Sequence, residues 1–251
     1  MSYRKKRYYE KVLIKAFFQR PLLYRFLLSL KQPDGSFTVH REGEIDVRAT
    51  YCVSCISIIL GIATPELFEG VGEAVARCQT YEGGLSAASH SLGEEGSSGA
   101  TLGEAHGGYA YCALASHLSL SLLPNTKRFA DSPFTKDFVS CKDGAQKPTD
   151  WNQSQSASSA RLNIDKALRW AVSQQGIPIE GGGFRGRTNK LVDGCYGWFS
   201  GGGMFTVLSA LVELQLGKWW KEEEEKGKLN GEGGQDGNRA SDEWESIEGG
   251  E

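Results

Sequence analysis

The segment Leu22–Phe37 reads LLYRFLLSLKQPDGSF, and its pattern decides the fold because it returns twice along the chain. It consists of an apolar helical pattern, a glutamine, a glycine turn and one large apolar residue. The same order appears as VARCQTYEGGL at Val75–Leu85 and as LRWAVSQQGIPIEGGGF at Leu168–Phe184. Repetition of one such unit is typical of helical arrays, in which each unit packs against its neighbours.

The spacing of these units indicates helix hairpins. Gln79 lies 47 residues after Gln32, and Gln174 lies 95 residues after Gln79, which is about two such steps. A second apolar helical pattern follows each turn and starts at Asp46, Glu104 or Asp193. No segment alternates apolar and polar residues between turn signals, as a strand would. The sequence therefore predicts an all-α fold with almost no sheet.

Composition divides the chain into one domain and a tail. The helical patterns predict a domain over 10–220, interrupted by polar inserts at about 86–101 and 124–159. Residues 221–251 are acidic and rich in glycine. Such segments lack the apolar surface that would offset the entropy lost on ordering, so we expect the two inserts and the tail to be disordered.

Charge and cysteine usage narrow the class of protein. The formal net charge is −3, which does not indicate a nucleic-acid partner. No apolar run approaches the ~20 residues that a membrane-spanning helix needs, so we expect no membrane span. Six cysteines are scattered through helical patterns, and the basic N-terminal segment is a poor signal peptide. We therefore expect reduced cysteines and a cytoplasmic protein.

Two of the second helices carry polar residues on apolar faces. Arg48 shares a helical face with Tyr51, Cys52 and Cys55, which is unusual for a sealed core because an unpaired buried guanidinium is costly. Either Arg48 pairs with an acidic neighbour at position 44 or 46 for structure, or it lines a cavity. His106, in the segment EAHGGY, stands at the same phase of the repeat as Arg48. Its two following glycines allow a close approach of backbone or ligand.

The richest segment is GGGFRGRTNKLVDGCYGWF at Gly181–Phe199. Arg187 and Lys190 offer a planar fork and a point charge, a pair suited to a diphosphate, although surface charge is the alternative. Asp193 and Cys195 can share one metal ion only where the chain is still entering a helix. A helix start would also lower the pKa of the thiol. A carboxylate and a thiolate suit catalytic Zn²⁺, whereas the alternative is a helix-capping aspartate beside a buried cysteine.

Several segments together resemble the β subunits of protein farnesyltransferases. They are SLKQPDGSF at 29–37, EIDVRATYC at 44–52, CQTYEGG at 78–84, EAHGGYAYC at 104–112 and GRTNKLVDGCY at 186–196. The resemblance implies an α–α toroid (barrel) and a heterodimer with a prenyltransferase α subunit. It further implies zinc-dependent transfer of a farnesyl group from farnesyl diphosphate to the cysteine of CaaX proteins. Geranylgeranyltransferase β subunits share the repeat, but NKLVDGCY and EAHGGY are closer to the farnesyl enzymes.

The resemblance also assigns residues to the substrates and the metal. Zinc would be held by Asp193, Cys195 and a later histidine. The residues expected at the diphosphate and the isoprenoid are Arg48, Tyr51, His106, Gly107, Gly108, Tyr109, Cys112, Arg187, Thr188, Asn189, Lys190, Tyr196, Gly197, Trp198 and Phe199. The family usually has a tryptophan where this chain has Phe199, so which of the rings of Trp198 and Phe199 meets the lipid stays open.

The chain also departs from the family pattern. No histidine follows position 117, so the third zinc ligand is missing. The family's acidic Mg²⁺-binding position and its first repeats have no counterpart, and we expect a chain truncated at both ends. Two alternatives to an active farnesyltransferase subunit follow. One is a catalytically impaired fragment that binds only the α subunit or a prenyl lipid, and the other is a geranylgeranyltransferase β subunit.

Overall fold

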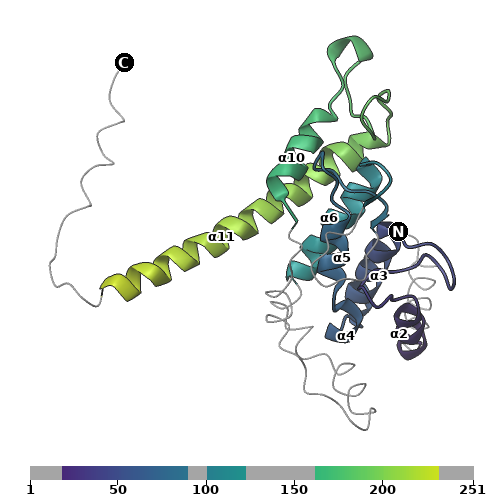
Figure 1. Ribbon diagram of the computed structural model, residues 1–251, viewed down its shortest axis with the longest axis vertical. Coiled ribbons are helices and arrows are strands. Elements are labelled where there is room, and N and C mark those ends of the chain that lie inside the picture. Colours follow the sequence, from purple (N-terminus) through teal and green to yellow (C-terminus); the bar gives the residue numbers. More distant parts are fainter. Residues whose placement is uncertain (1–18, 90–100, 123–161, 232–251) are drawn as a thin grey trace, which may run out of the picture. The chain divides into compact units, whose positions relative to one another are not determined.

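The computed structural model describes residues 19–89, 101–122 and 162–231 (Figure 1). By its internal contacts the chain divides into two units, residues 1–211 and 212–251. All of the site residues expected from the sequence fall in the first unit.

Three helices in the first unit each lead into a glycine turn, and we call them the leading helices. They are α2 (Arg20–Ser29), α5 (Val71–Arg77) and α10 (Ile164–Ser173). The short helix α4 (Pro65–Phe68) comes just before α5. The side chains of Thr64 and Asn163 accept hydrogen bonds from backbone N–H groups at the starts of α4 and α10, which satisfies donors that a helix leaves unpaired.

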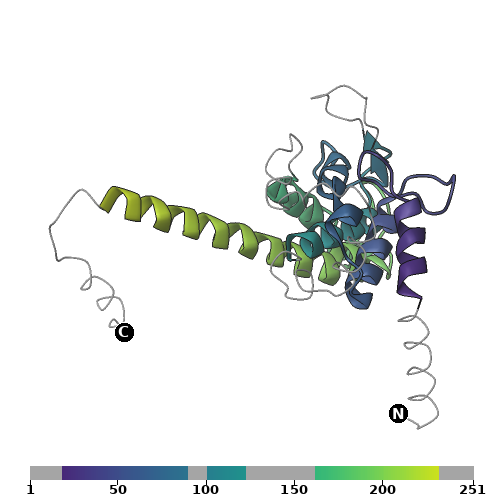
Figure 2. The ribbon, with the colours of Figure 1, turned by 90° about the horizontal axis from the view of Figure 1, so that it is seen from below.

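A second set of helices follows the turns. It comprises α3 (Val47–Leu60), α6 (Gly107–Leu122), and the π-helical turn η3 (Gly197–Gly202), which continues into α11 (Gly203–Gly231). The 3-10 turn η2 (Pro178–Glu180) lies within the third glycine turn. Figures 1 and 2 show α3 and α6 side by side, and η3 also packs against α6. This arrangement brings the starts of the three following helices to one region of the unit.

The turns show how the repeat is built, and they shift the expected register by one residue. Isolated antiparallel bridges join Lys31 to Phe37, Gln79 to Leu85 and Gln175 to Phe184. The equivalent positions are therefore Lys31, Gln79 and Gln175, rather than the three glutamines that the sequence pattern aligned. Their spacing is 48 and then 96 residues, so the second interval is twice the first. The glutamine pattern was misleading because neighbouring Gln174 and Gln175 occupy different positions, and only Gln174 is buried.

Sheet structure among the described residues is minimal, as expected. Strands β1 (Ala88–Ser89) and β2 (Thr101–Leu102) form one short antiparallel pair. The expectation of disorder over 86–101 is wrong at its N-terminal edge, because Ser86 and Ser89 are buried there. The Ser86 hydroxyl donates to the carbonyl of Cys78 or of Ala88. Hydrogen bonds therefore order this polar segment, although it has little apolar surface to bury. Residues 90–100 and the whole insert at 124–159 lie outside the described residues.

Residues of the second unit differ from the expectation of a disordered tail. Helix α11 continues through 221–231, because the glutamates, lysines and leucine there are good helix formers. Residues 232–251 lie outside the described residues. Within this unit, Trp219 and Trp220 are half or more exposed, and their ring centroids are 4.9 Å apart.

One helix in the described part of the chain, Gly197–Lys226, is long and apolar enough to cross a membrane by length and composition alone. This is weak evidence, because the core helix of a soluble protein passes the same test. The expectation of no membrane span stays a prediction.

Candidate functional site

His106 lies immediately before α6 and connects the start of that helix with the start of η3. Its Nδ1 accepts a hydrogen bond from the backbone N–H of Gly108 at 3.0 Å. A neutral imidazole whose Nδ1 accepts carries its proton on Nε2. His106 Nε2 lies 2.9 Å from the hydroxyl oxygen of Tyr196, so the ring donates to Tyr196. The Tyr196 hydroxyl proton is then available to another acceptor.

Two glycines allow this close contact. The N–H of Gly107 donates to the carbonyl of Gly186 at 2.7 Å. A Cβ on Gly186 would lie 2.0 Å from the ring of Tyr196, and a Cβ on Gly107 would lie 2.1 Å from the hydroxyl of Ser200. Side chains at these positions would therefore push the start of α6 away from the segment that enters η3.

Two guanidinium groups act on His106. Burial lowers the pKa of His106, and the charges of Arg187 and Arg48 lower it further, against an opposing effect of Glu104. Arg187 forms an ion pair with the carboxylate of Glu104. The site therefore contains a neutral histidine beside two permanent positive charges.

Of the two alternatives for Arg48, the structure bears out pairing with an acidic neighbour, whereas lining a cavity stays a prediction. Arg48 pairs with Asp46 at 2.6 Å, which is the structural alternative. Its guanidinium also lies 5.2 Å from the centroid of the Tyr109 ring, which in turn lies 4.7 Å from the His106 ring. We call His106, Tyr109, Tyr196, Arg48 and Arg187 the His106 cluster.

The loop after Arg187 is exposed and only partly connected to the cluster. Thr188 donates to the carboxylate of Glu82 at 3.4 Å, and the backbone N–H of Lys190 donates to the carbonyl of Arg187 at 3.3 Å. Asn189 adopts a left-handed conformation with φ of 60°. No described contact places the ammonium of Lys190 in the His106 cluster.

A second aromatic group, built from the same segments as the cluster, is centred on Tyr111, which the sequence analysis missed. The Tyr111 ring lies 5.7 Å from Tyr51, 5.9 Å from Trp198 and 5.7 Å from Phe199, in edge-to-face arrangements. Both rings left open by the resemblance therefore contact the same tyrosine. Cys112 follows Tyr111, and burial raises the pKa of its thiol to about 12, so it stays protonated at neutral pH.

Asp193 and Cys195 lie together on the exposed turn that precedes η3. The backbone N–H of Cys195 donates to Asp193 Oδ1 at 3.1 Å. Desolvation and the Asp193 carboxylate raise the pKa of the Cys195 thiol. The expected lowering is thus wrong for the protein without metal, because Cys195 precedes the helix and faces a negative charge. Within the described ranges, no group of three or more His, Cys, Asp or Glu residues could hold a metal ion.

Glu104 is the second residue that the sequence analysis missed. It lies two positions before His106 in the segment EAHGGY, at the expected start of a helical pattern. A carboxylate so close to a candidate anion site is the signal that could have drawn attention to it. Tyr111 carried a comparable signal, since it follows the expected site residue Tyr109 by two positions.

The chain is similar to several curated farnesyltransferase β subunits. It is 35% identical over 199 residues to the β subunit from Pisum sativum, covering 78% of this chain and 35% of that protein. It is 38% identical over 192 residues to the β subunit from Schizosaccharomyces pombe, covering 76% and 37%. The chain thus spans little more than a third of the length of these relatives.

Among solved structures, a chain of the Candida albicans protein geranylgeranyltransferase-I complexed with GGPP aligns with 75% of this chain and 46% of that chain. The TM-score is 0.39 and the identity 20%, too low to equate individual residues. The family model of the prenyltransferase alpha-alpha toroid domain matches residues 12–236, which confirms the expected fold class. The chain therefore belongs to the prenyltransferase α–α toroid family.

Proposed function

We propose that this chain is the β subunit of a protein farnesyltransferase and works in a heterodimer with a prenyltransferase α subunit in the cytoplasm. The reaction is transfer of a farnesyl group from farnesyl diphosphate to the cysteine thiol of a CaaX protein. The single observation that carries the proposal is the His106 cluster. It joins a neutral imidazole, a phenol with an available proton and two guanidinium groups from three segments of the repeat.

The cluster suits the diphosphate leaving group. Arg187 presents a fork that can bind two phosphate oxygens, and the Tyr196 hydroxyl can donate a further hydrogen bond because His106 donates to its oxygen. Lys190, Thr188 and Asn189 stand on the same loop as Arg187 and would reach the diphosphate from it. Negative charge grows on this group as the bond to C1 of the prenyl chain breaks, and positioned donors lower the barrier by stabilising that charge.

The aromatic group around Tyr111 suits the prenyl chain. Apolar ring surface on the same segments as the cluster comes from Tyr51, Tyr111, Trp198 and Phe199. A prenyl diphosphate has the same two parts, an anionic head and an apolar tail. The proposal therefore retains the diphosphate-binding and isoprenoid-binding residues that the resemblance assigned, and it adds Tyr111 to the residues that contact the isoprenoid.

Zinc fits this chain only in part. Asp193 and Cys195 are hard and soft donors of the kind that zinc accepts, and they lie on one turn. They would supply two ligands, and none of the described residues completes the set. When bound, the metal would keep the cysteine of the acceptor protein as a thiolate near neutral pH. A Mg²⁺ ion is the second metal that the resemblance to the farnesyltransferases raises as a possible cofactor, and the described residues give it no support.

The proposal is tested on the complex with a prenyltransferase α subunit. We expect farnesyl diphosphate to bind and inorganic diphosphate to compete, as measured by titration calorimetry, with transfer to a CaaX peptide followed separately. Arg187→Ala should weaken the binding of both farnesyl diphosphate and inorganic diphosphate. Arg25→Ala, which removes an exposed arginine from α2, is the matched control. Absence of farnesyl diphosphate binding to the unmodified complex would contradict the proposal.

A second candidate is a chain that binds the α subunit or a prenyl diphosphate without catalysing transfer. The incomplete set of metal donors among the described residues favours it. Binding of farnesyl diphosphate with no transfer at saturating zinc would select this candidate. Equal binding and use of geranylgeranyl diphosphate would instead indicate a geranylgeranyltransferase β subunit.

A further inference from the structure

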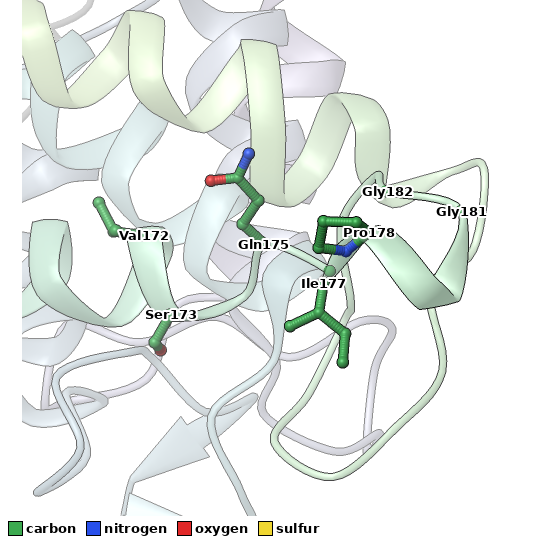
Figure 3. Close-up of a pocket in the computed structure, with 8 residues that line it drawn as sticks. Val172, Ser173, Gln175, Ile177, Pro178, Gly181 and Gly182 are labelled. Atoms are coloured by element: carbon green, nitrogen blue, oxygen red, sulfur yellow. The ribbon is translucent and has the colours of Figure 1, made fainter.

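Two of the glycine turns lead into hairpins of the same build. An antiparallel bridge joins the first and last residues of each hairpin, Thr38 to Ile45 and Arg185 to Val192. In both, the backbone N–H of the aspartate that follows, Asp46 or Asp193, donates to the carbonyl of the phenylalanine that precedes, at 3.2 or 3.1 Å. We call 38–45 the first hairpin and 185–192 the second hairpin, which follows the glycine turn that lines the groove in Figure 3. The two hairpins are equal in length, so their positions can be compared one by one.

The tip of each hairpin is a tight four-residue turn. The N–H of its fourth residue donates to the carbonyl of its first, at 3.0 Å in the turn 40–43 and at 3.3 Å in the turn 187–190. The third residue is left-handed in both turns, with φ of 59° at Glu42 and 60° at Asn189. Among the described residues, these are the two non-glycine residues with positive φ. A closed turn of this kind therefore requires the left-handed region at its third position.

The base of the second hairpin is fixed by its neighbours. The carbonyl of the buried Gly186 accepts a hydrogen bond from the N–H of Gly107 at 2.7 Å. A Cβ on Gly186 would lie 2.0 Å from the ring of Tyr196, so this ring packs directly against the backbone. Because the base is held, the conformation of the tip decides where Arg187 and Lys190 lie.

Arg187 and Lys190 are the first and fourth residues of the turn in the second hairpin. The Cα atoms at these two positions of a β-turn lie within about 7 Å of each other. In the closed turn, the guanidinium and ammonium side chains therefore start from neighbouring points of the backbone, from which both can reach one diphosphate. When the turn opens, Lys190 moves away from Arg187, because only Arg187 adjoins the fixed Gly186.

The residue type at position 189 agrees with a role of the backbone. Asparagine enters the left-handed region more readily than most residues that carry a Cβ, and glycine enters it freely. Alanine adopts it at a higher cost, and a β-branched residue such as valine is an outlier there. Asn189 thus meets the requirement of the turn without any contact between its amide and a ligand.

We propose that Asn189 is a positioning residue of the anion site, which acts through its left-handed backbone and not through its amide. It keeps the turn closed, so that Arg187 and Lys190 bind the same diphosphate. The inference rests on the anion-binding part of the proposed function, and it replaces the direct contact that the resemblance assigned to Asn189. A residue that disfavours the left-handed region lets this exposed turn open. The apparent affinity then falls in proportion to the fraction of molecules in which the turn is closed.

Three substitutions at position 189 remove the amide equally but differ in how readily they adopt the left-handed region. The measurement is titration calorimetry of inorganic diphosphate with the complex that contains a prenyltransferase α subunit. Asn189→Gly should bind within about twofold of the unmodified complex, Asn189→Ala roughly five- to tenfold more weakly and Asn189→Val about thirtyfold more weakly. Equal losses in Asn189→Gly and Asn189→Ala, or no loss in Asn189→Ala, would overturn the proposal.

Glu42 provides a matched control. It has the same backbone conformation on a turn that is also exposed and that supplies no member of the His106 cluster. Glu42→Gly, Glu42→Ala and Glu42→Val should bind inorganic diphosphate alike. Thermal melts establish which variants fold, and if a valine variant does not, the glycine and alanine variants decide the comparison. The same graded loss in the Glu42 series would indicate a general loss of stability and overturn the proposal.

A double substitution separates positioning from direct contact. In a complex that already carries Lys190→Ala, Asn189→Ala should weaken binding of inorganic diphosphate only about twofold or less, because one of the two cations that the turn brings together is gone. An amide that bound the diphosphate itself would contribute the same factor in both backgrounds. That outcome would overturn the proposal.

Farnesyl diphosphate, titrated in parallel, distinguishes failure of this inference from failure of the proposed function. Graded binding of inorganic diphosphate without any binding of farnesyl diphosphate would contradict the proposed function and support the role of Asn189. Binding of both ligands without the graded loss would overturn the role of Asn189 alone. Absence of binding of either ligand to the unmodified complex would overturn both.

Discussion

The His106 cluster and the turn that holds Asp193 and Cys195 adjoin in sequence but differ in how complete they are. In the cluster, residues from three segments are linked by a hydrogen bond, ring contacts and a cation–π contact. On the turn, a carboxylate and a thiol face solvent with no third donor among the described residues. The difference teaches that the described part of the repeat brings together the groups of the proposed anion site, whereas it supplies only two of the donors that the proposed metal site would need.

The largest effect expected from this difference concerns zinc. We expect the chain with its α subunit to bind Zn²⁺ on the order of a thousandfold more weakly than a site with three protein ligands, because the described residues supply only two donors. Competition with a chromophoric chelator measures the affinity, and Cys195→Ser should abolish the residual binding. Stoichiometric zinc at nanomolar affinity would show that the metal site is complete after all.

The next effect concerns the anion site. Arg187→Ala should weaken farnesyl diphosphate binding by roughly 10- to 100-fold, since a charge-assisted bond contributes about 1.5–3 kcal/mol. Binding of the CaaX peptide should change much less, because in the proposal the peptide thiol binds at the turn that holds Asp193 and Cys195. Calorimetric titrations with each ligand make the comparison. Equal losses for both ligands would contradict the separation of the two regions.

A smaller effect of opposite sign is expected from substitution of Glu104. In the structure without diphosphate, the Glu104 carboxylate forms an ion pair with the Arg187 guanidinium. Glu104→Gln should tighten binding of inorganic diphosphate about two- to fivefold, because exposed ion pairs contribute about 0.2–1 kcal/mol. Glu82→Gln removes a charge from the same region without touching Arg187 and is the matched control. Weaker binding in Glu104→Gln alone would indicate that Glu104 positions Arg187 instead of competing for it.

The smallest effect concerns pH. Burial, Arg187 and Arg48 lower the pKa of His106, whereas in the unfolded chain it should be near ~6.5. Between these two values the unfolded chain binds more protons, so the free energy of unfolding should fall as pH drops below ~6.5. Urea titrations at pH 7.5, 6.5 and 5.5 measure this, with His106→Gln as the reference. An identical pH dependence in the two proteins would show that His106 does not titrate differently on folding.

Much of this molecule follows from local sequence. Apolar periodicity and turn glycines, which act over a few residues, predict the repeat, the helix hairpins and the scarcity of sheet that the described residues show. The segment EAHGGY and the loop from Arg187 to Tyr196 could be recognised as site candidates because their residue types suit anions and metals. Helix starts were expected at Asp46, Glu104 and Asp193, and the structure begins those helices at Val47, Gly107 and, with η3, Gly197.

The tertiary structure decided which groups meet. The ion pair of Glu104 with Arg187, the central place of Tyr111 and the proton on His106 Nε2 all depend on partners far apart in sequence or on exact orientation. The shift from Gln32 to Lys31 as the repeated position likewise needed the bridges of the turns. Local sequence patterns specify which helix or turn each segment can form, because helix propensity, capping and turn geometry depend on residues close together in the sequence. Contacts between segments are chosen only when packing of the whole unit brings their backbones together.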